Sequence, residues 1–414
     1  MPEIPDRDPS RRSFLKASAG FAAGAAAMGF PAINALGANE AINVAAIGTG
    51  GRCRHLLGAL AKVPGVRIAA ACDVYAPNLD AGRKLADPRA ILSRHYQELL
   101  DRKDIDAVLI GTPDHWHVPI TVAACAAGKD VYVEKPLTHD LAEGRAVVEA
   151  QDKHGRIVQV GTQQRSMPQF LRGRELIRAG RLGAIHKVHL TWNRNSDRVR
   201  RGPQGIDAKQ LDWKAFLGNA PDQPFDEYRY ANWRWFWDFG GGIFTDLMVH
   251  FIDVAHWFLD LDHPVAAASI GNHFTSDGVW ETPDTVQTLL TYPGGVQVHF
   301  EGTFCNAREG AHIVFMGADA DLYLDRGRLE LTPERGRGQA EELNLGGGRR
   351  GQDFYGAPDG ELLHLTNWIE SVRSRSRPTC PAEAGVSAAS AAHLANKSLR
   401  AGRMIRWDEP PAAA

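Results

Sequence analysis

A short apolar run that ends in a glycine-rich turn limits the folds open to this chain more than any other feature. The run Ile42–Ile47 is typical of a buried strand, and an apolar helical stretch, His55–Lys62, follows the turn. Glycines between a strand and a helix allow a tight turn, and they let backbone N–H groups approach a pyrophosphate at the helix N-terminus. Cys53, a small residue, stands where the third glycine of this pattern is expected. The pattern predicts a dinucleotide-binding turn made of Gly48, Thr49, Gly50, Gly51 and Arg52.

An acidic residue after the second predicted strand supports this interpretation. The strand is Val66–Cys72, and Asp73 follows it directly. A carboxylate at this place accepts hydrogen bonds from the adenosine ribose hydroxyls and repels a 2′-phosphate. We therefore expect NAD(H) as the cofactor, while the nearby Arg83 and Lys84 leave NADP(H) open.

Strand and helix patterns divide the chain into two kinds of domain. Up to residue 162, apolar runs such as Asp106–Ile110 and Asp130–Val133 alternate with helical stretches, which predicts a parallel Rossmann domain over residues 39–162. Residues 163–414 contain longer runs with alternating polarity, which favour an α+β domain with a large, mostly antiparallel open sheet. Pro293–Gly295 is expected to turn a hairpin, and Glu334–Asp353 to be a mobile surface loop.

The first 38 residues differ from the rest of the chain. Ser10–Lys16 reads SRRSFLK and precedes a weakly apolar, Ala- and Gly-rich run, Ala17–Phe30, so this segment resembles a twin-arginine signal peptide. The run is too short and glycine-rich for a stable membrane anchor. The resemblance implies recognition by the twin-arginine export machinery and a periplasmic protein that is exported folded, with its cofactor tightly bound. A net charge of −2 gives no attraction to nucleic acid, so no nucleic-acid partner is expected.

Three further motifs appear in a fixed order along the chain. They are Gly111-Thr112-Pro113-Asp114-His115-Trp116-His117, then Glu134-Lys135-Pro136, then the segment Gly240–His250 with its sequence GGGIFTDLMVH. In this order, after a glycine-rich fingerprint, they resemble the Gfo/Idh/MocA family of glucose-fructose oxidoreductases and inositol dehydrogenases. The resemblance implies that Lys135, Asp246 and His250 form the catalytic group. It also implies that Thr112, Pro113, His117, Glu134 and Lys135 belong to the cofactor site, with His117 at the nicotinamide end.

These residue types suit the oxidation of a secondary alcohol. The hydroxyl loses a proton while its carbon loses hydride, and a histidine is suited to accept that proton. Asp246 and His250 are four residues apart, so a helix would place them on one face, with Asp246 orienting His250. Lys135 would donate a hydrogen bond to the substrate oxygen. No metal site is expected, because His250, Asp253 and His256 do not share one helix face.

The sequence indicates the substrate-binding residues less clearly than the cofactor-binding and catalytic ones. The aromatic and basic segment Trp233–Trp237, with Arg234 and Trp235, is typical either of a sugar-binding wall or of an aromatic core. Gln163, Arg165 and Asn193 are further candidates that the resemblance places near the substrate. The leading hypothesis is an exported NAD(P)-dependent oxidoreductase acting on a ring hydroxyl of a sugar, glycoside or cyclitol, and forming a homo-dimer or homo-tetramer. Two alternatives are an NAD-dependent glycosidase that works by transient oxidation and elimination, and a non-catalytic, nucleotide-bound sugar sensor.

Overall fold

The computed structural model describes residues 41–336, 338–352 and 359–409. The predicted signal peptide, residues 1–38, lies outside these described residues. Within the described ranges, no helix combines the length and the apolar character needed to cross a membrane.

The first half of the described chain forms a six-stranded parallel sheet in the order β3-β2-β1-β4-β5-β6. Its strands are β1 (Ile42–Ile47), β2 (Val66–Cys72), β3 (Ile91–Ser93), β4 (Ala107–Ile110), β5 (Asp130–Val133) and β6 (Val158–Val160). The strand order reverses direction between β1 and β4, and a cleft for a dinucleotide forms at such a point in doubly wound sheets.

Helices cover both faces of this sheet. They are α2 (Gly51–Leu60), α3 (Ala76–Arg83), α4 (Tyr96–Leu100), α5 (His117–Ala126) and α6 (Gly144–His154). Side chains alternate along β1, so Val44 packs on the face covered by α2, whereas Ala45 packs on the face covered by α5. Because both faces are covered, the strands are mostly apolar and largely buried.

The second half forms a nine-stranded sheet in the order β14-β13-β12-β11-β7-β10-β9-β8-β15. Only the β7–β10 pair is parallel. The strands are β7 (Ile185–Asn193), β8 (Ala266–Asn272), β9 (Thr285–Thr291), β10 (Gln297–Thr303), β11 (Ala311–Gly317), β12 (Ala320–Leu324), β13 (Arg328–Pro333), β14 (Glu341–Asn344) and β15 (Ile405–Arg406). The two sheets confirm the predicted fold class.

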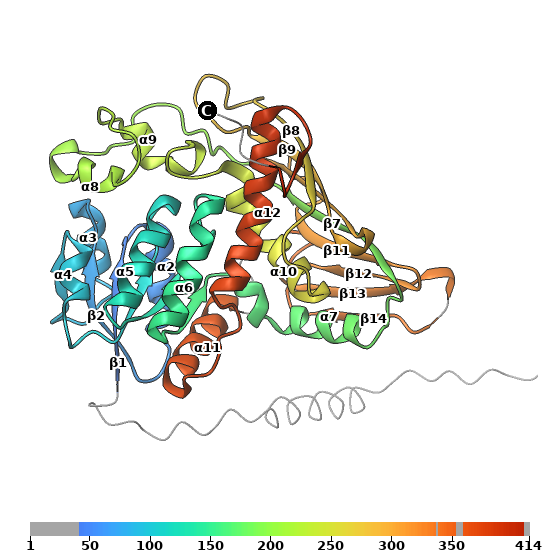
Figure 1. Ribbon diagram of the computed structural model, residues 1–414, viewed down its shortest axis with the longest axis horizontal. Helices are drawn as coiled ribbons and strands as arrows, with labels where there is room; N and C mark the ends of the chain where they lie inside the picture. Colours follow the sequence, from blue (N-terminus) through green and yellow to red (C-terminus); the bar gives the residue numbers. More distant parts are fainter. Residues whose placement is uncertain (1–40, 337, 353–358, 410–414) are drawn as a thin grey trace, which may run out of the picture. The chain divides into compact units, whose positions relative to one another are not determined.

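One face of the second sheet packs against helices, and the last two helices also reach the first sheet (Figure 1). The helices on this face are α7 (Pro168–Arg178), α10 (Val249–Leu259) and α12 (Ala382–Ala401). Helices α8 (Trp213–Leu217) and α9 (Glu227–Ala231) lie above the helices of the parallel sheet in Figure 1, and α11 (Gly360–Ser374) packs on α2. Helix α12 contacts α6 and β6 on one side and α10 and β8 on the other. Helix α11 packs on α2, and its Trp368 is fully buried against the face of the parallel sheet that α2 covers.

Two local expectations have different outcomes. The hairpin at Pro293–Gly295 is confirmed, because β9 and β10 pair antiparallel around it. The expectation of a mobile loop over Glu334–Asp353 is wrong for part of that segment, which forms strand β14 beside β13. Glu341 in this strand pairs with Arg172 of α7 at 2.7 Å, so an ion pair and a strand ladder hold a stretch whose composition suggested a loop.

Candidate active site

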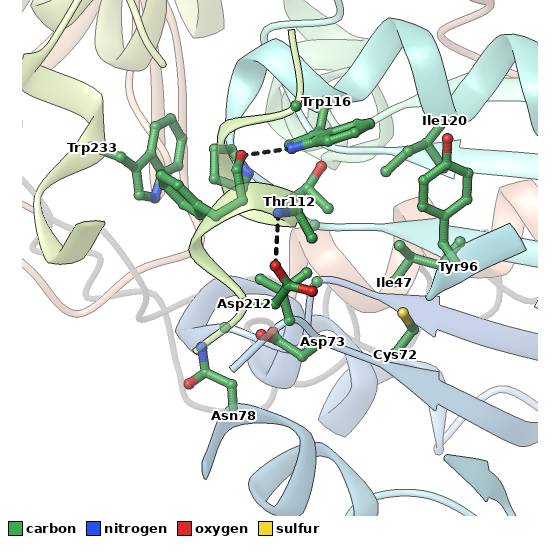
Figure 2. Close-up of a pocket in the computed structure, with 18 of the residues that line it drawn as sticks. Ile47, Cys72, Asp73, Asn78, Tyr96, Thr112, Trp116, Ile120, Asp212 and Trp233 are labelled. Atoms are coloured by element: carbon green, nitrogen blue, oxygen red, sulfur yellow. Dashed lines mark hydrogen bonds between the residues drawn. The ribbon is translucent and has the colours of Figure 1, made fainter. Parts of the chain in front are cut away.

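A cavity of about 640 Å³ lies at the carboxyl ends of the parallel strands, where the strand order reverses. We call it the nucleotide cavity. Its floor comes from the turn after β1 and from Asp73 after β2, and its roof comes from Asp212–Phe216 and Tyr230–Arg234. Figure 2 shows Asp73 and Asn78 on one side of this space and Trp116 and Trp233 on the other. The Trp116 indole donates to the carbonyl of Phe216 at 2.9 Å and ties the roof to the nucleotide domain.

The glycine-rich turn leaves room for a ligand. Gly48 has a φ of +79°, and a Cβ there would lie 2.7 Å from the backbone nitrogen of Thr112. A Cβ on Gly50 or Gly51 would meet nothing within 4 Å. Helix α2 starts at this turn without a side-chain cap and without an acidic residue in its first turn. Free N–H groups and a positive helix end suit a pyrophosphate, so the turn fits the dinucleotide that the sequence predicts.

The missing third glycine is compensated from the facing loop. Cys53 is fully buried in α2, and a Cβ on Gly111 after β4 would lie 2.8 Å from the Cys53 Cβ. The close approach of helix and loop is therefore kept, with the small residue on the other side of the contact.

Asp73 is a buried carboxylate that lines the nucleotide cavity. Tyr75 donates its backbone N–H to Asp73 at 2.9 Å, and the Thr49 hydroxyl lies at 3.4 Å. Within the described chain Asp73 makes no ion pair, and burial raises its pKa to about 6, although these hydrogen bonds act in the opposite direction. Its remaining acceptor capacity suits ribose hydroxyls, and its charge opposes a 2′-phosphate. The two basic residues that kept NADP(H) open, Arg83 and Lys84, are exposed and do not line the cavity.

A second cavity of about 240 Å³ adjoins the first, and we call it the catalytic cavity. Both cavities are lined by Arg52, Gly111, Thr112, Trp233 and Arg234. The Lys135 ammonium, which follows β5, donates to the carboxylate of Asp246 at 2.9 Å and to the Asp246 carbonyl at 2.6 Å. Arg234 donates to the same carboxylate at 3.2 Å. Burial raises the pKa of Asp246, but the charges of Lys135 and Arg234 outweigh it and hold that pKa well below its usual value.

His250 lines the catalytic cavity from α10. Its ring stacks on Trp192 of β7, with the ring centroids 5.2 Å apart. Its Nδ1 is buried and has no hydrogen-bond partner among the described residues. Burial, together with the positive charges of Lys135 and Arg326, lowers the pKa of His250 well below 6.5. The imidazole is therefore neutral and able to accept a proton at neutral pH.

Asp246 and His250 make no hydrogen bond with each other in the structure, although both line the catalytic cavity and the Asp246 charge acts to raise the His250 pKa. Asp246 lies in a π-helical turn, Phe244–Met248, and the α-helix starts only at Val249. A π turn takes up more residues than an α turn, so a spacing of four residues no longer aligns two side chains. The Asp246 carboxylate contacts Lys135 and Arg234 instead, and these ion pairs hold the lysine side chain in place.

Comparisons with known proteins agree with this geometry. The NAD-binding Rossmann-fold model of an oxidoreductase family matches residues 42–162, and the GFO/IDH/MocA C-terminal domain matches residues 170–323. The chain belongs to this family. As a Gfo/Idh/MocA protein, it is an NAD-binding oxidoreductase.

Relatives within the family include two inositol dehydrogenases. Inositol 2-dehydrogenase of Salmonella typhimurium is 26% identical over 67% of this chain and 69% of its own length. Myo-inositol 2-dehydrogenase of Thermotoga maritima is 25% identical over 79% of this chain and 86% of its own length. Among solved structures, levoglucosan dehydrogenase in complex with NADH and levoglucosan has a TM-score of 0.69 at 17% identity, covering 89% of this chain and all of the other. Aldose-aldose oxidoreductase from Caulobacter crescentus has a TM-score of 0.67 at 18% identity, covering 88% and 99%. These structures share the fold.

The residues predicted for the cofactor take up different positions in this Gfo/Idh/MocA protein. Gly48, Gly50, Gly51, Arg52, Asp73, Thr112 and Pro113 line the nucleotide cavity, whereas Glu134, Lys135 and His117 line the catalytic cavity. Thr49 is fully buried, lines neither cavity and bonds through its hydroxyl to the carbonyl of Asn78 at 2.9 Å, so its side chain supports the turn. His117 lies between the carbonyls of Thr112 and Pro136, at 3.0 and 2.6 Å, and links the loops after β4 and β5.

Of the five residues predicted for the substrate, only Arg234 lines the catalytic cavity. Arg165 is buried in a two-pronged ion pair with Asp253, with both contacts at 2.8 Å. Trp235 stacks on Trp280 with centroids 4.3 Å apart, which is the core role left open by the sequence. Two amides also contact protein outside the cavity: Gln163 bonds to Tyr132 and Glu134, and Asn193 bonds to Glu301 and the carbonyl of Arg308.

Asp114, Arg198 and Arg326 are among the cavity residues for which the sequence predicted no role. Asp114 follows Thr112 and Pro113 directly, so its place in the motif was a usable signal. Arg326 lies in the turn between β12 and β13, and no sequence pattern points to it. Within the described parts of the chain, no group of three or more His, Cys, Asp or Glu side chains could hold a metal ion.

Proposed function

We propose that this protein is an exported NAD(H)-dependent oxidoreductase that transfers hydride between the nicotinamide and a ring hydroxyl of a sugar, glycoside or cyclitol. One observation carries the proposal: the Lys135–Asp246 pair and His250 line a cavity whose wall is shared with the nucleotide cavity. A substrate there lies directly beside the end of a bound dinucleotide. The inositol and sugar dehydrogenases among the relatives and fold neighbours support the substrate class.

The side chains divide the chemistry among them. An ammonium has three N–H donors, and Lys135 gives two contacts to Asp246, so one donor remains for the substrate oxygen. That donor stabilises negative charge as it develops on the oxygen. The neutral His250 takes the hydroxyl proton, since its ring is uncharged and lines the same cavity. Bound NAD⁺ supplies the hydride acceptor.

The test uses the purified full chain with NAD⁺ and a panel of substrates. The panel contains myo-inositol, glucose, levoglucosan and an aryl glycoside, and the readout is NADH absorbance together with product analysis. We expect NADH and one keto product in equal amounts from at least one cyclitol or sugar. Failure of the whole panel, with NAD bound, would refute the proposed reaction and favour a nucleotide-bound sensor.

One cavity residue supports an NAD-dependent glycosidase as a second candidate. Asp114 is buried at 4% exposure and lines the catalytic cavity. Burial raises its pKa well above the usual value, and the nearby Lys135 and Arg234 offset only part of this rise. A neutral carboxylic acid is suited to protonate a leaving glycosidic oxygen. Release of the aglycone without accumulation of NADH would favour this candidate.

Export and tight cofactor binding form a separate part of the proposal. The motif Ser10–Lys16 supports recognition by the twin-arginine machinery and a periplasmic location. Replacing both Arg11 and Arg12 by Lys should keep the folded protein in the cytoplasm, as measured by cell fractionation. We also expect NAD to be released when the protein purified from the periplasm is denatured. Periplasmic recovery of the double variant at the wild-type level would contradict the export route.

We also propose a homo-dimer or homo-tetramer that forms through the outer face of the nine-stranded sheet. Ile270 of β8 and Leu289 of β9 lie on this face and are 69% and 55% exposed. Exposed apolar side chains on a sheet face are often covered by a second copy. Light scattering should give a multiple of the 45.2 kDa chain mass, and Leu289→Lys should lower it. A wild-type monomer at micromolar concentration would refute the assembly.

A further inference from the structure

The roof of the nucleotide cavity belongs to a part of the chain outside the matched NAD-binding domain. That domain ends at residue 162, whereas the roof, Asp212–Phe216 and Tyr230–Arg234, lies within the matched C-terminal domain, residues 170–323. The roof and the floor face the same cavity. A dinucleotide bound there would therefore contact both domains.

The roof is fixed to the end of β2. The Asp212 N–H donates to the Val74 carbonyl at 3.0 Å. The Arg94 guanidinium joins the two segments, because it donates to the Val74 carbonyl and, at 3.0 Å, to the Gln210 carbonyl. Val74 follows Asp73 directly, so these contacts hold the roof in a fixed position above the carboxylate that the sequence predicts for the ribose.

Tyr230 of α9 lines the nucleotide cavity from the roof. Its ring contacts two other aromatic rings edge to face, with centroids 5.6 Å from Tyr75 and 4.9 Å from Phe216. Tyr75 belongs to the NAD-binding domain and Phe216 to the roof, and such aromatic pairs have preferred geometries. The two contacts therefore fix the ring where the two domains meet.

The Tyr230 hydroxyl lies near Asp73 and has a hydrogen-bond donor to spare. Asn78 of α3 donates its side-chain N–H to the Tyr230 oxygen at 3.3 Å. Burial and the charge of Asp73 raise the pKa of Tyr230, so the phenol keeps its proton at neutral pH. Among the described residues, none accepts a hydrogen bond from this O–H group. A phenol has one donor, and here that donor remains for a ligand.

We propose that Tyr230 binds the cofactor from the second domain, by donating its O–H to a hydroxyl of the adenosine ribose that itself donates to Asp73. A ribose hydroxyl both donates and accepts, so it can join an ionised carboxylate, which only accepts, to a phenol with an unused donor. This inference goes beyond the proposed function, because it concerns NAD binding and requires no particular substrate.

The test removes each partner of the proposed hydrogen bond in turn. NADH bound to the full chain is displaced by ADP or by 2′,3′-dideoxy-ADP, which lacks both ribose hydroxyls, and nicotinamide fluorescence gives the dissociation constants. Tyr230→Phe keeps the ring and removes its hydroxyl. We expect it to weaken ADP binding about fivefold to tenfold, the range for one hydrogen bond, and to change dideoxy-ADP binding far less. Loss of the Asn78 contact affects both ligands alike and cancels in the ratio.

Tyr228→Phe is the matched control. Tyr228 lies on the same helix but outside both cavities, and its hydroxyl bonds to the Val199 carbonyl and the Trp280 indole. This variant should leave the ratio of the two dissociation constants unchanged. Equal weakening of ADP and dideoxy-ADP by Tyr230→Phe, or no weakening of either, would overturn the inference. The proposed hydride transfer would still stand, because the substrate panel tests it separately.

A second measurement keeps the hydroxyl and does not depend on how Tyr230→Phe folds. With 3-fluorotyrosine in place of Tyr230, the fluorine lies beside the phenol oxygen, so its NMR resonance responds to the hydrogen bond that the O–H makes. Adding ADP should shift this resonance more than adding dideoxy-ADP does. Equal shifts would overturn the inference.

Discussion

The two adjoining cavities are lined by different kinds of chemical groups. The nucleotide cavity is large, and backbone, neutral side chains and a single buried carboxylate without an ion pair dominate its floor. The catalytic cavity is less than half that size and contains ion pairs between Lys135, Arg234 and Asp246. Recognition of a long cofactor needs shape and a few acceptors, whereas moving a proton needs charges held in place. The difference implies that one substitution can weaken cofactor binding and another can slow the reaction, each with little effect on the other property.

The largest difference between the effect on kcat and the effect on NADH affinity is expected for Lys135→Ala. Loss of the donor to the substrate oxygen should lower kcat about 10³-fold, the size found when one preorganised donor is removed. Affinity for NADH, measured by fluorescence titration, should change only a few-fold, because Lys135 does not line the nucleotide cavity. The control is Lys153→Ala, an exposed lysine on α6. A matching loss of NADH affinity would show that the two cavities act as one.

A smaller effect of the opposite kind is expected for Asp73→Asn. Removing the charged acceptor should weaken NAD binding about 10- to 100-fold, because hydrogen bonds to charged groups contribute about 1.5–3 kcal/mol. The preference for NAD over NADP should also decrease, since the charge that opposes a 2′-phosphate is lost. At saturating NAD, kcat should change far less than the affinity does. Asp80→Asn on α3 is a control outside both cavities. An unchanged dissociation constant would contradict the assignment of Asp73.

The smallest expected effect is that NADH affinity and kcat depend differently on pH. Burial raises the pKa of Asp73 to about 6, so its carboxylate is charged above that pH and is protonated as the pH falls through it. NADH affinity should therefore fall about tenfold between about pH 7 and pH 5. His250 has a pKa well below 6.5, so kcat at saturating cofactor should stay level down to pH 6.5. A decline of kcat above pH 6.5 would instead indicate that the ring is protonated in the complex.

The floor of the nucleotide cavity could be predicted from the sequence, whereas its roof and the contacts within the catalytic cavity could not. Gly48, Gly50 and Asp73 lie on one continuous strand–turn–helix–strand unit, so local sequence fixes their neighbourhood. Lys135 and His250 depend on contacts between two domains, and only the family resemblance connected them in advance. The resemblance did not reveal the π turn at Phe244–Met248, which redirects Asp246 to Lys135.

Substrate residues were the weakest part of the prediction, for a physical reason. Arg165 and Trp235 have the side chains that a sugar site uses, yet the same side chains satisfy a buried ion pair and an aromatic stack. Arg326 is brought to the cavity by a turn between two strands, and its distance along the chain from the other lining residues hides it. Composition identifies residue types, while the order of strands in the second sheet decides which of them face the cavity.

Helix α11 has a consequence for how the protein is made. Its Leu365, Trp368 and Ile369 pack on the face of the parallel sheet that α2 covers, although they come far after that sheet in the sequence. We therefore expect the nucleotide domain to fold only after nearly the whole chain has been synthesised, and a chain stopped before Gly360 to bind no NAD in a pull-down on immobilised nucleotide. Cofactor binding would then follow the end of translation, so that NAD is bound only by full-length chains.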